Sequence, residues 1–373
     1  MSRLGAILRA HGPAYRQRFQ TRMSSDQLRA MRDLEACHTP ALGGVRWRCP
    51  QCQERLFTYR SCGNRHCPAC GHADALLWLH RQQRLLLPAV TYHLLTVTVP
   101  ERLRLPIRSH PRALLPIFFE AAVSALQDLC RDPRFLGAVP GLSAVLHTWT
   151  RQLLYHPHIH VLATGGGLAP DGAWHSTPSP AFLVPVHALS RLVRARLRDG
   201  LRQHCPSVFQ ELPASLWRRP WVVHSKPVGS GEHALSYLAR YIFRVALADS
   251  AILRHDQRAV LFRYRDGKTG QKRTARLQPQ EFIRRFLQHV LPSGFRKVRH
   301  YGLHHSSKRQ ALRLLQAQLA FVHARPLPPA AAPALPSAPP PLCPRCHRPM
   351  LADPLTPPRS PTPAPRPSPD NTS

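Results

Sequence analysis

The segment 155–164 constrains the fold of this chain more than any other. Its centre reads His158-Ile-His160, within an apolar run that shows no helical period and that three glycines, 165–167, follow. Such a run is typical of a half-buried β-strand, in which side chains at positions i and i+2 point to the same face. We therefore expect two neighbouring imidazoles that could bind a divalent metal ion. The alternative is that both histidines only pack at a strand end.

A third metal ligand is expected, and two residues of the preceding predicted strand, 143–153, compete for the position. Gln152 lies six residues before His158 and could reach across a hairpin, whereas His147 has the opposite parity on the same strand. Successive strand residues point to opposite faces, so only one of the two can face the site. We assign Gln152. His156 precedes a proline and is expected to shape the turn.

Tyr237 and Tyr241 lie four residues apart in a predicted helix over about 232–247. That spacing puts both side chains on one face of a helix. Aromatic residues at this spacing also form ordinary core packing, which is the alternative. Combined with a metal-binding pair of histidines, two tyrosines on one face are suited to cleaving DNA through a phosphotyrosine.

These motifs and their flanking segments resemble the rolling-circle transposases of the insertion-sequence-91 type, which are two-tyrosine members of the His-hydrophobic-His (HUH) nuclease superfamily. The resemblance covers roughly residues 26–310, and its ordered matches include 146–149, 165–168, 226–229, 281–286 and 299–302. It implies an α+β fold, with an HUH nuclease-type antiparallel sheet flanked by helices.

The resemblance also implies a chemistry. Tyr237 and Tyr241 would be the nucleophiles and Mg²⁺ or Mn²⁺ the catalytic ion at His158 and His160, in an enzyme that nicks and rejoins single-stranded or hairpin DNA at element ends. The glycines 165–167 would either let the DNA backbone approach or form a plain loop. A relaxase or a rolling-circle replication initiator would use the same chemistry. A non-catalytic zinc DNA-binding protein derived from such an enzyme is the remaining alternative.

A cysteine-rich module occupies about 36–74. Cys49 and Cys52, with Cys67 and Cys70, form two Cys-x2-Cys pairs separated by 14 residues, a spacing typical of a structural zinc site. Four buried free cysteines are the alternative. Cys37, Cys62 and His66 could form a second zinc site in this module, and His38 or His72 could complete it.

Downstream, Cys343 and Cys346 form half of a zinc knuckle. Since no second pair lies nearby in the sequence, this pair could bind zinc only with His347 and another ligand, or with a partner. It lies in a proline-rich stretch, 326–369, that holds 18 of the 40 prolines. Such a composition predicts a disordered tail.

The formal charge of +33 requires a polyanionic partner, and nucleic acid fits better than a membrane because no basic amphipathic anchor is visible. Only five of the 52 basic residues are lysine; the rest are arginines, which suit bidentate phosphate contacts. The DNA-contact candidates lie in the cysteine module and beside the tyrosines: Arg46, Arg48, Arg60, Arg65, Arg240 and Arg244.

The sequence predicts three parts: a helical lead and zinc-binding domain at 1–88, a catalytic domain at 89–324, and a disordered tail at 325–373 with a lone Cys-x2-Cys. No signal peptide and no apolar run long enough to span a bilayer is visible in the sequence. We therefore expect a protein of the bacterial cytoplasm, associated with the nucleoid and not with a membrane.

Overall fold

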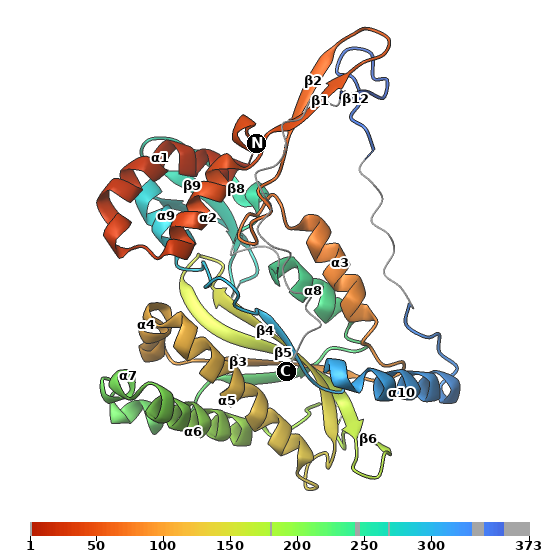
Figure 1. Ribbon diagram of the computed structural model, residues 1–373. Coiled ribbons are helices and arrows are strands. Elements are labelled where there is room, and N and C mark those ends of the chain that lie inside the picture. The colour runs from red at the N-terminus through yellow and green to blue at the C-terminus, as the bar shows by residue number, and fades with distance from the viewer. Residues whose placement is uncertain (1, 180, 243–246, 268, 330–338, 354–373) are drawn as a thin grey trace.

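The computed structural model describes residues 2–179, 181–242, 247–267, 269–329 and 339–353, without the side chains of 72, 73 and 240–242. Within these ranges the largest sheet has six strands, and all neighbouring strands in it are antiparallel (Figure 1). Its order is β11-β4-β5-β3-β7, and β6 pairs with β5. The strands are β3 (Tyr92–Thr98), β4 (Val139–Trp149), β5 (Tyr155–Leu168), β6 (Trp174–Ser176), β7 (Val223–Pro227) and β11 (Val298–Gly302). The predicted α+β class is confirmed.

The two faces of this sheet are covered by different helices. On β3, Leu95 and Val97 point to one face, where they join the main core with α5 and α6, while Tyr92 and Leu94 point to the other. That alternation follows from the two-residue period of a strand. The first face is covered by α4 (Glu101–Ser109), α5 (Pro111–Arg131), α6 (Val186–His204) and α7 (Pro206–Gln210); the second by α3 (His72–Gln83) and α8 (Glu232–Ile242).

Helix α5 is long and apolar enough to cross a membrane by length and composition. However, 61% of its apolar window is buried inside the protein, where Phe118 and Phe119 contribute to the main core. A buried core helix of a soluble domain passes the same test, so α5 is explained by its packing against the sheet.

A second core lies beside the sheet and joins distant parts of the chain. Helices α1 (Arg3–Phe19) and α2 (Ser25–Ala36) pack against α9 (Pro279–Leu287) and the small sheet β8 (Ile252–His255), β9 (Val260–Arg265) and β10 (Lys272–Leu277). Ser24 caps α2 in a capping box with Gln27. The N-terminal helices therefore share a core with elements beyond the boundary predicted at residue 88.

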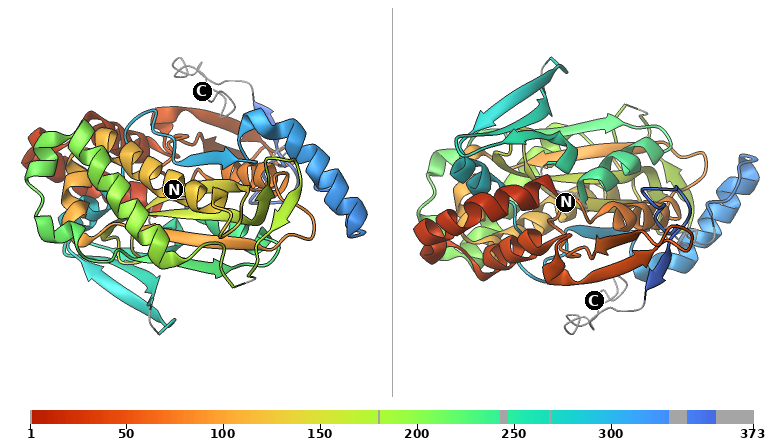
Figure 2. Two further views of the ribbon diagram at one scale, coloured as in Figure 1. Left: turned by 90° about the horizontal axis from the view of Figure 1, so that it is seen from below. Right: turned by 90° about the horizontal axis from the view of Figure 1, so that it is seen from above.

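The cysteine module projects from the body as a hairpin of β1 (Gly44–Arg48) and β2 (Arg55–Tyr59). The strand β12 (Leu351–Asp353) pairs with β1 in the same sheet. The prediction that the whole tail after residue 325 is disordered is therefore wrong for residues 339–353. Two further elements, α10 (Arg309–Val322) and the cyan β9–β10 hairpin, also project from the body in both views of Figure 2.

The three glycines after the histidines lie inside β5, so neither the loop nor the DNA-approach reading holds. A Cβ atom on Gly165 would collide with the backbone carbonyl of Thr91, and one on Gly166 with the ring of Trp174. These glycines let neighbouring strands and a tryptophan approach β5 closely.

Short 3-10 helices complete the chain: Gln20–Arg22, Pro40–Leu42, Ala214–Trp217, Asp249–Ala251 and Ser306–Lys308.

Candidate active site and metal centres

Three histidines converge on the face of the sheet that α8 covers. His147 on β4 pairs directly with His158 on β5, and His160 follows two residues later on the same face. The ring centroids lie 5.3 Å apart for His147 and His158, 4.6 Å for His147 and His160, and 4.8 Å for His158 and His160. One nitrogen from each ring lies within 4.8 Å of the other two. These residues fit the binding of one divalent cation.

Two hydrogen bonds orient the β5 histidines. Nδ1 of His158 lies 2.7 Å from the backbone oxygen of His156, and Nδ1 of His160 lies 2.9 Å from Oγ1 of Thr96 on β3. Since a carbonyl oxygen only accepts, Nδ1 of His158 carries the proton, which leaves Nε2 as the ligand atom. His156, expected to shape a turn, instead orients His158 from within β5.

Burial keeps the three imidazoles neutral. Desolvation lowers the pKa of His158 to about 4 and that of His160 to about 3. The pKa of His147, which is 3% exposed, lies well below its usual range for the same reason. Neutral imidazole is the form that binds metal, so near pH 7 none of the three has to release a proton first.

The assignment of Gln152 as third ligand is wrong. Strand β4 ends at Trp149, so Gln152 lies in the turn beyond it, where Nε2 donates to Oη of Tyr264 at 3.0 Å. Because successive strand residues point to opposite faces, only one of the two residues could lie on the ligand face, and that residue is His147. The predicted strand extends to residue 153, whereas β4 ends four residues earlier, at Trp149.

The tyrosine helix lies over the histidines. Helix α8 contacts β4 and α3, and the Tyr237 ring meets the His160 ring edge-on, with 6.2 Å between centroids. The same ring also packs against the apolar cluster beneath α8. Tyr241 lies one turn further along α8, and its side chain, like that of Arg240, is outside the described residues. Arg244 lies outside them altogether.

Two lysines that the sequence analysis did not single out surround this site. Nζ of Lys297 lies 4.6 Å from the ring centroid of Trp149, and burial lowers its pKa to about 7. Lys226 on β7 lies close enough to His160 to contribute to that ring's lowered pKa. Lys297 stands in no recognised motif, and Lys226 opens the matched segment 226–229 without a role being assigned to it there, so only the strand order shows that both lysines lie at this site.

The cysteines form two groups of four among the described residues. In the first, Sγ of Cys37 lies 3.4 Å from that of Cys70 and 3.6 Å from that of Cys67, and Cys62 lies 3.6 Å from Cys70. A hydrogen bond from Cys62 lowers the pKa of Cys37 to about 7. Thiolate is the form that binds zinc.

The second group draws on both ends of the chain and contains Cys49, Cys52, Cys343 and Cys346. The predicted single site of Cys49 and Cys52 with Cys67 and Cys70 is therefore wrong. Linear spacing suggested that grouping, but strand β2 runs back toward the body and separates the two pairs.

Two of the three histidines proposed for the cysteine module, His66 and His38, take other roles, and the side chain of His72 lies outside the described residues. Nε2 of His66 accepts from the backbone N–H of Leu291 at 3.2 Å, so His66 anchors the module to the body instead of joining a cysteine group. Nδ1 of His38 lies 3.0 Å from the backbone oxygen of Tyr59.

The candidate DNA-contact arginines of the module divide into two kinds. Arg65 donates to the backbone oxygens of Leu291, Pro292 and Phe295, and Arg46 forms an ion pair with Asp353 at 2.7 Å, so both are structural. Arg48 is exposed and Arg60 half-buried, and both stay candidates.

Comparisons with known proteins identify the family of this chain. A family model described as "Putative transposase" matches residues 141–311, and one described as "Transposase zinc-binding domain" matches residues 7–99. "Putative transposase y4qJ" of Sinorhizobium fredii is 36% identical over 79% of this chain and 78% of that protein. "Transposase for insertion sequence element IS801" of Pseudomonas savastanoi pv. phaseolicola is 28% identical over 72% and 67%, respectively. No solved structure matches the chain significantly.

Proposed function

This chain belongs to the transposases of the insertion-sequence-91 type, with an N-terminal zinc-binding domain, and we propose on this premise that it nicks and rejoins single-stranded DNA through a 5′-phosphotyrosine. The observation that carries the proposal is the Tyr237 ring edge-on against His160, 6.2 Å between centroids, above three neutral histidines. A nucleophile and a metal site thus face the same space.

Cleavage would proceed by in-line attack. Oη of Tyr237 or Tyr241 releases its proton to solvent and forms a bond to phosphorus, the bond from phosphorus to the 3′ oxygen breaks, and the departing 3′ oxygen takes up a proton from solvent. A divalent cation at the histidines would act as a Lewis acid on the scissile phosphate. The new phosphotyrosine ester keeps the energy of the cleaved bond, so a 3′-OH can reverse the reaction without ATP.

His147, His158 and His160 supply three imidazole nitrogens, and imidazole suits Mn²⁺ better than Mg²⁺, which prefers oxygen ligands. Lys226 would help to hold the phosphate. The two-tyrosine arrangement would let one hydroxyl keep the cleaved 5′ end while the other attacks a second phosphate.

A relaxase or a replication initiator would share this chemistry, but both relatives are named as transposases. A non-catalytic descendant is disfavoured because the histidine group is complete. We place the protein in the bacterial cytoplasm, on the nucleoid DNA on which it acts.

The test is a nicking assay on an end-labelled single-stranded oligonucleotide carrying an element end. Wild-type protein should cleave it with Mn²⁺ and not after chelation. His158→Ala should abolish cleavage, whereas the control Gln152→Ala should retain it. Cleavage that persists in His158→Ala, or that needs no metal, would refute the proposal.

A further inference from the structure

The tip of the cysteine module holds two turns of the same construction, taken from opposite ends of the chain. One runs Cys49-Pro-Gln-Cys52 and the other Cys343-Pro-Arg-Cys346. In each, the residue after the second cysteine has a left-handed φ, 58° for Gln53 and 56° for His347. Each such residue donates its N–H to the oxygen of the first cysteine, at 3.1 Å and 2.9 Å.

The four sulfurs of these turns are spaced for a tetrahedral ion. Sγ of Cys49 lies 3.5 Å from that of Cys346, and Sγ of Cys52 lies 3.5 Å from Cys343 and 3.7 Å from Cys346. Zinc bound to four thiolates at ~2.3 Å puts the sulfurs about 3.8 Å apart. These sulfurs are too far apart for a disulfide, whose length is about 2.05 Å.

We propose that Cys49, Cys52, Cys343 and Cys346 hold a zinc ion that joins the C-terminal segment to the N-terminal module. Cys343 and Cys346 lie outside both family matches, which end at residues 99 and 311. The two turns form one zinc ribbon whose halves are separated by the catalytic domain. Strand β12 then continues the β1–β2 sheet, and Arg46 pairs with Asp353 at 2.7 Å.

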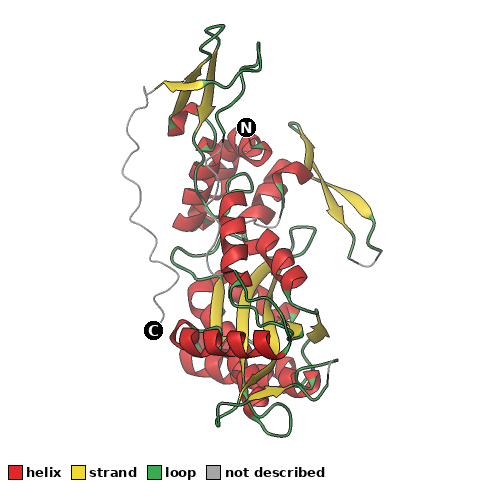
Figure 3. Ribbon diagram, turned by 90° about the vertical axis from the view of Figure 1, so that its right-hand side faces the viewer, coloured by secondary structure: helices red, strands yellow, loops and turns green. Residues whose placement is uncertain are grey.

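The tip needs the metal because it has little apolar core of its own. Its buried cluster consists of Cys49, Cys343 and Met350, with Trp47 and Leu56 partly buried. Three buried side chains cannot offset the entropy of ordering such a unit, so bound zinc would supply the folding energy. The hairpin lies at the end of the molecule farthest from the six-stranded sheet (Figure 3), so the body does not support it.

Zinc content of the full chain, measured by inductively coupled plasma mass spectrometry after gel filtration in reductant, tests the proposal. Wild-type protein should carry two zinc ions per chain and Cys343→Ser one. The control Cys205→Ser, which changes a cysteine of neither group, should carry two. One zinc ion per chain in the wild-type protein, or two zinc ions per chain in Cys343→Ser, would overturn the proposal.

Should Cys343→Ser fail to fold, cobalt titration of the wild-type protein gives the same answer. The thiolate-to-Co²⁺ absorption should saturate at two equivalents, and Cys343 should resist alkylation until a chelator is added. Saturation at one equivalent, or alkylation of Cys343 in the metal-loaded protein, contradicts the second site. Neither measurement depends on DNA cleavage, so the number of zinc sites is tested independently of the proposed function.

A separate observation concerns the β9–β10 hairpin. Its inner side chains, such as Phe262, join the second core, while the outer face carries Arg263 and Arg265 on β9 and Lys272 and Arg276 on β10. All four are exposed, and Lys272 lies directly opposite Arg265. Like charges placed directly opposite each other on a sheet are destabilising.

Within the described residues none of these four cations forms an ion pair, although two neighbouring arginines do. Arg273 lies 3.9 Å from Asp266 and Arg254 lies 3.5 Å from Asp256. Arg276 contributes to the lowered pKa of Asp256, so the cations of this face without a carboxylate partner among the described residues are Arg263, Arg265 and Lys272. A polyanion laid along it would remove the repulsion.

We infer that this face binds the phosphates of duplex DNA beside the nick, an inference that rests on the proposed function. A two-stranded ribbon fits a major groove. Single strands are usually held by stacking on aromatic side chains, and the outer face, which also holds Leu261 and Thr274, has none. Duplex DNA is therefore the better occupant.

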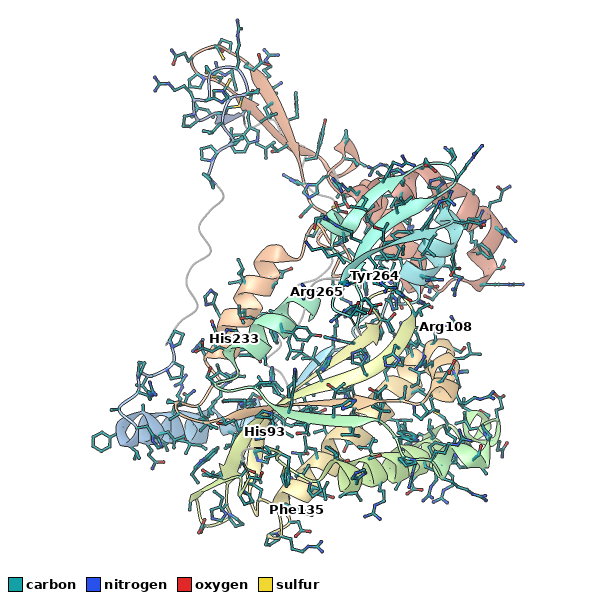
Figure 4. All side chains as sticks on the ribbon, turned by 180° about the vertical axis from the view of Figure 1, so that it is seen from behind. His93, Arg108, Phe135, His233, Tyr264 and Arg265 are labelled. Carbon is teal, nitrogen blue, oxygen red and sulfur yellow. The ribbon has the colours of Figure 1, made fainter. Side chains whose placement is uncertain are left out.

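The turn end of the hairpin is bonded to the turn that joins the two histidine strands, β4 and β5. Oη of Tyr264 accepts from Gln152, and Arg151 donates to the backbone oxygens of Arg265 and Asp266 at 3.2 and 3.1 Å. Gln152 and Arg151 lie in the turn that joins β4 to β5, between His147 and His158 in sequence. Figure 4 shows Tyr264 and Arg265 at this junction. A duplex held by the hairpin would therefore have its end near the histidines.

The test compares two variants that each lose three positive charges. The ribbon variant carries Arg263→Gln, Arg265→Gln and Lys272→Gln; the control carries Arg102→Gln, Arg191→Gln and Arg313→Gln, at exposed positions elsewhere. Duplex affinity should fall at least tenfold further in the ribbon variant, with a salt slope shallower by roughly 2–3.

Nicking of a fully single-stranded substrate should stay at the wild-type rate in the ribbon variant. Equal losses of duplex affinity in the two variants would overturn the inference, as would a larger loss for single strands than for duplex. Because binding is measured without catalysis, a failure of the proposed nicking chemistry would be visible separately, in the wild-type protein.

Discussion

At the scale of single residues, the candidate site depends on strand register. His158 and His160 are adjacent in the sequence pattern, so their pairing could be predicted locally. His147 joins them only because β4 pairs with β5 so that His147 faces His158. A shift of one residue would have turned His147 to the opposite face. The sequence narrowed the choice to two residues, and the end of β4 decided between them.

The third ligand can be tested by substitution. His147→Ala should weaken Mn²⁺ binding at least as much as the ~10–100-fold that loss of an outer-shell partner causes. Gln152→Ala should leave the Mn²⁺ affinity unchanged, since its amide bonds to Tyr264. Isothermal titration of the two variants distinguishes them. The reverse order of effects would restore Gln152 as the ligand.

Metal binding should also respond little to pH. The pKa of His158 is lowered to about 4 and that of His160 to about 3, so protons do not compete with the metal above about pH 5. Three histidines with ordinary pKa values near 6.5 would lose roughly 30-fold in affinity between pH 7 and pH 6. We expect less than a twofold change in Mn²⁺ affinity over that interval. A decline near 30-fold would show that the histidines titrate normally.

At the scale of elements, most helices and strands could be predicted because their periodicity is strong. The sequence pattern predicts a strand over 92–99 and a helix over 186–203, and β3 (Tyr92–Thr98) and α6 (Val186–His204) agree with these ranges to within one residue. The cysteine groups could not be predicted, because Cys52 and Cys343 meet across 291 residues of sequence. Linear spacing favoured the nearer pair, Cys67 and Cys70, and only the pairing of β12 with β1 reveals the true neighbours.

The glycines of β5 give a stability prediction. Gly165→Ala should lower the free energy of unfolding by about 1–3 kcal/mol, because its methyl group would collide with the Thr91 backbone, which cannot move without β3. The control Gly267→Ala should change it by less than about 0.5 kcal/mol, since an added Cβ there meets nothing within 4 Å. Urea denaturation compares the two. Equal effects would contradict the close packing of β5.

At the scale of the whole molecule, the net charge of +33 can be read from the sequence, but the location of the positive charges on the surface is visible only in the structure. Arg65 and Arg46 bind protein atoms, whereas the β9–β10 hairpin, which no motif marked, carries exposed charge. Arginine content therefore predicted a nucleic-acid partner without identifying the surface.

DNA binding by the full chain should be strongly salt-dependent. Each phosphate neutralised contributes about −0.9 to the slope of log affinity against log salt on duplex DNA. We expect the slope of log affinity against log salt to be steeper than about −4. Fluorescence anisotropy titrations at salt concentrations between roughly 50 and 200 mM measure this slope. Tight binding with a flat slope would mean that the positive surface is not used.

The central claim is that a tyrosine of α8 becomes joined to DNA. Wild-type protein should be incubated with Mn²⁺ and a single-stranded element end, digested, and the peptide–DNA adducts mapped by mass spectrometry. We predict adducts on Tyr237 or Tyr241, reduced in each single Phe variant and absent from Tyr237→Phe/Tyr241→Phe. An adduct on any other residue, or cleavage by wild-type protein without an adduct, would contradict the account.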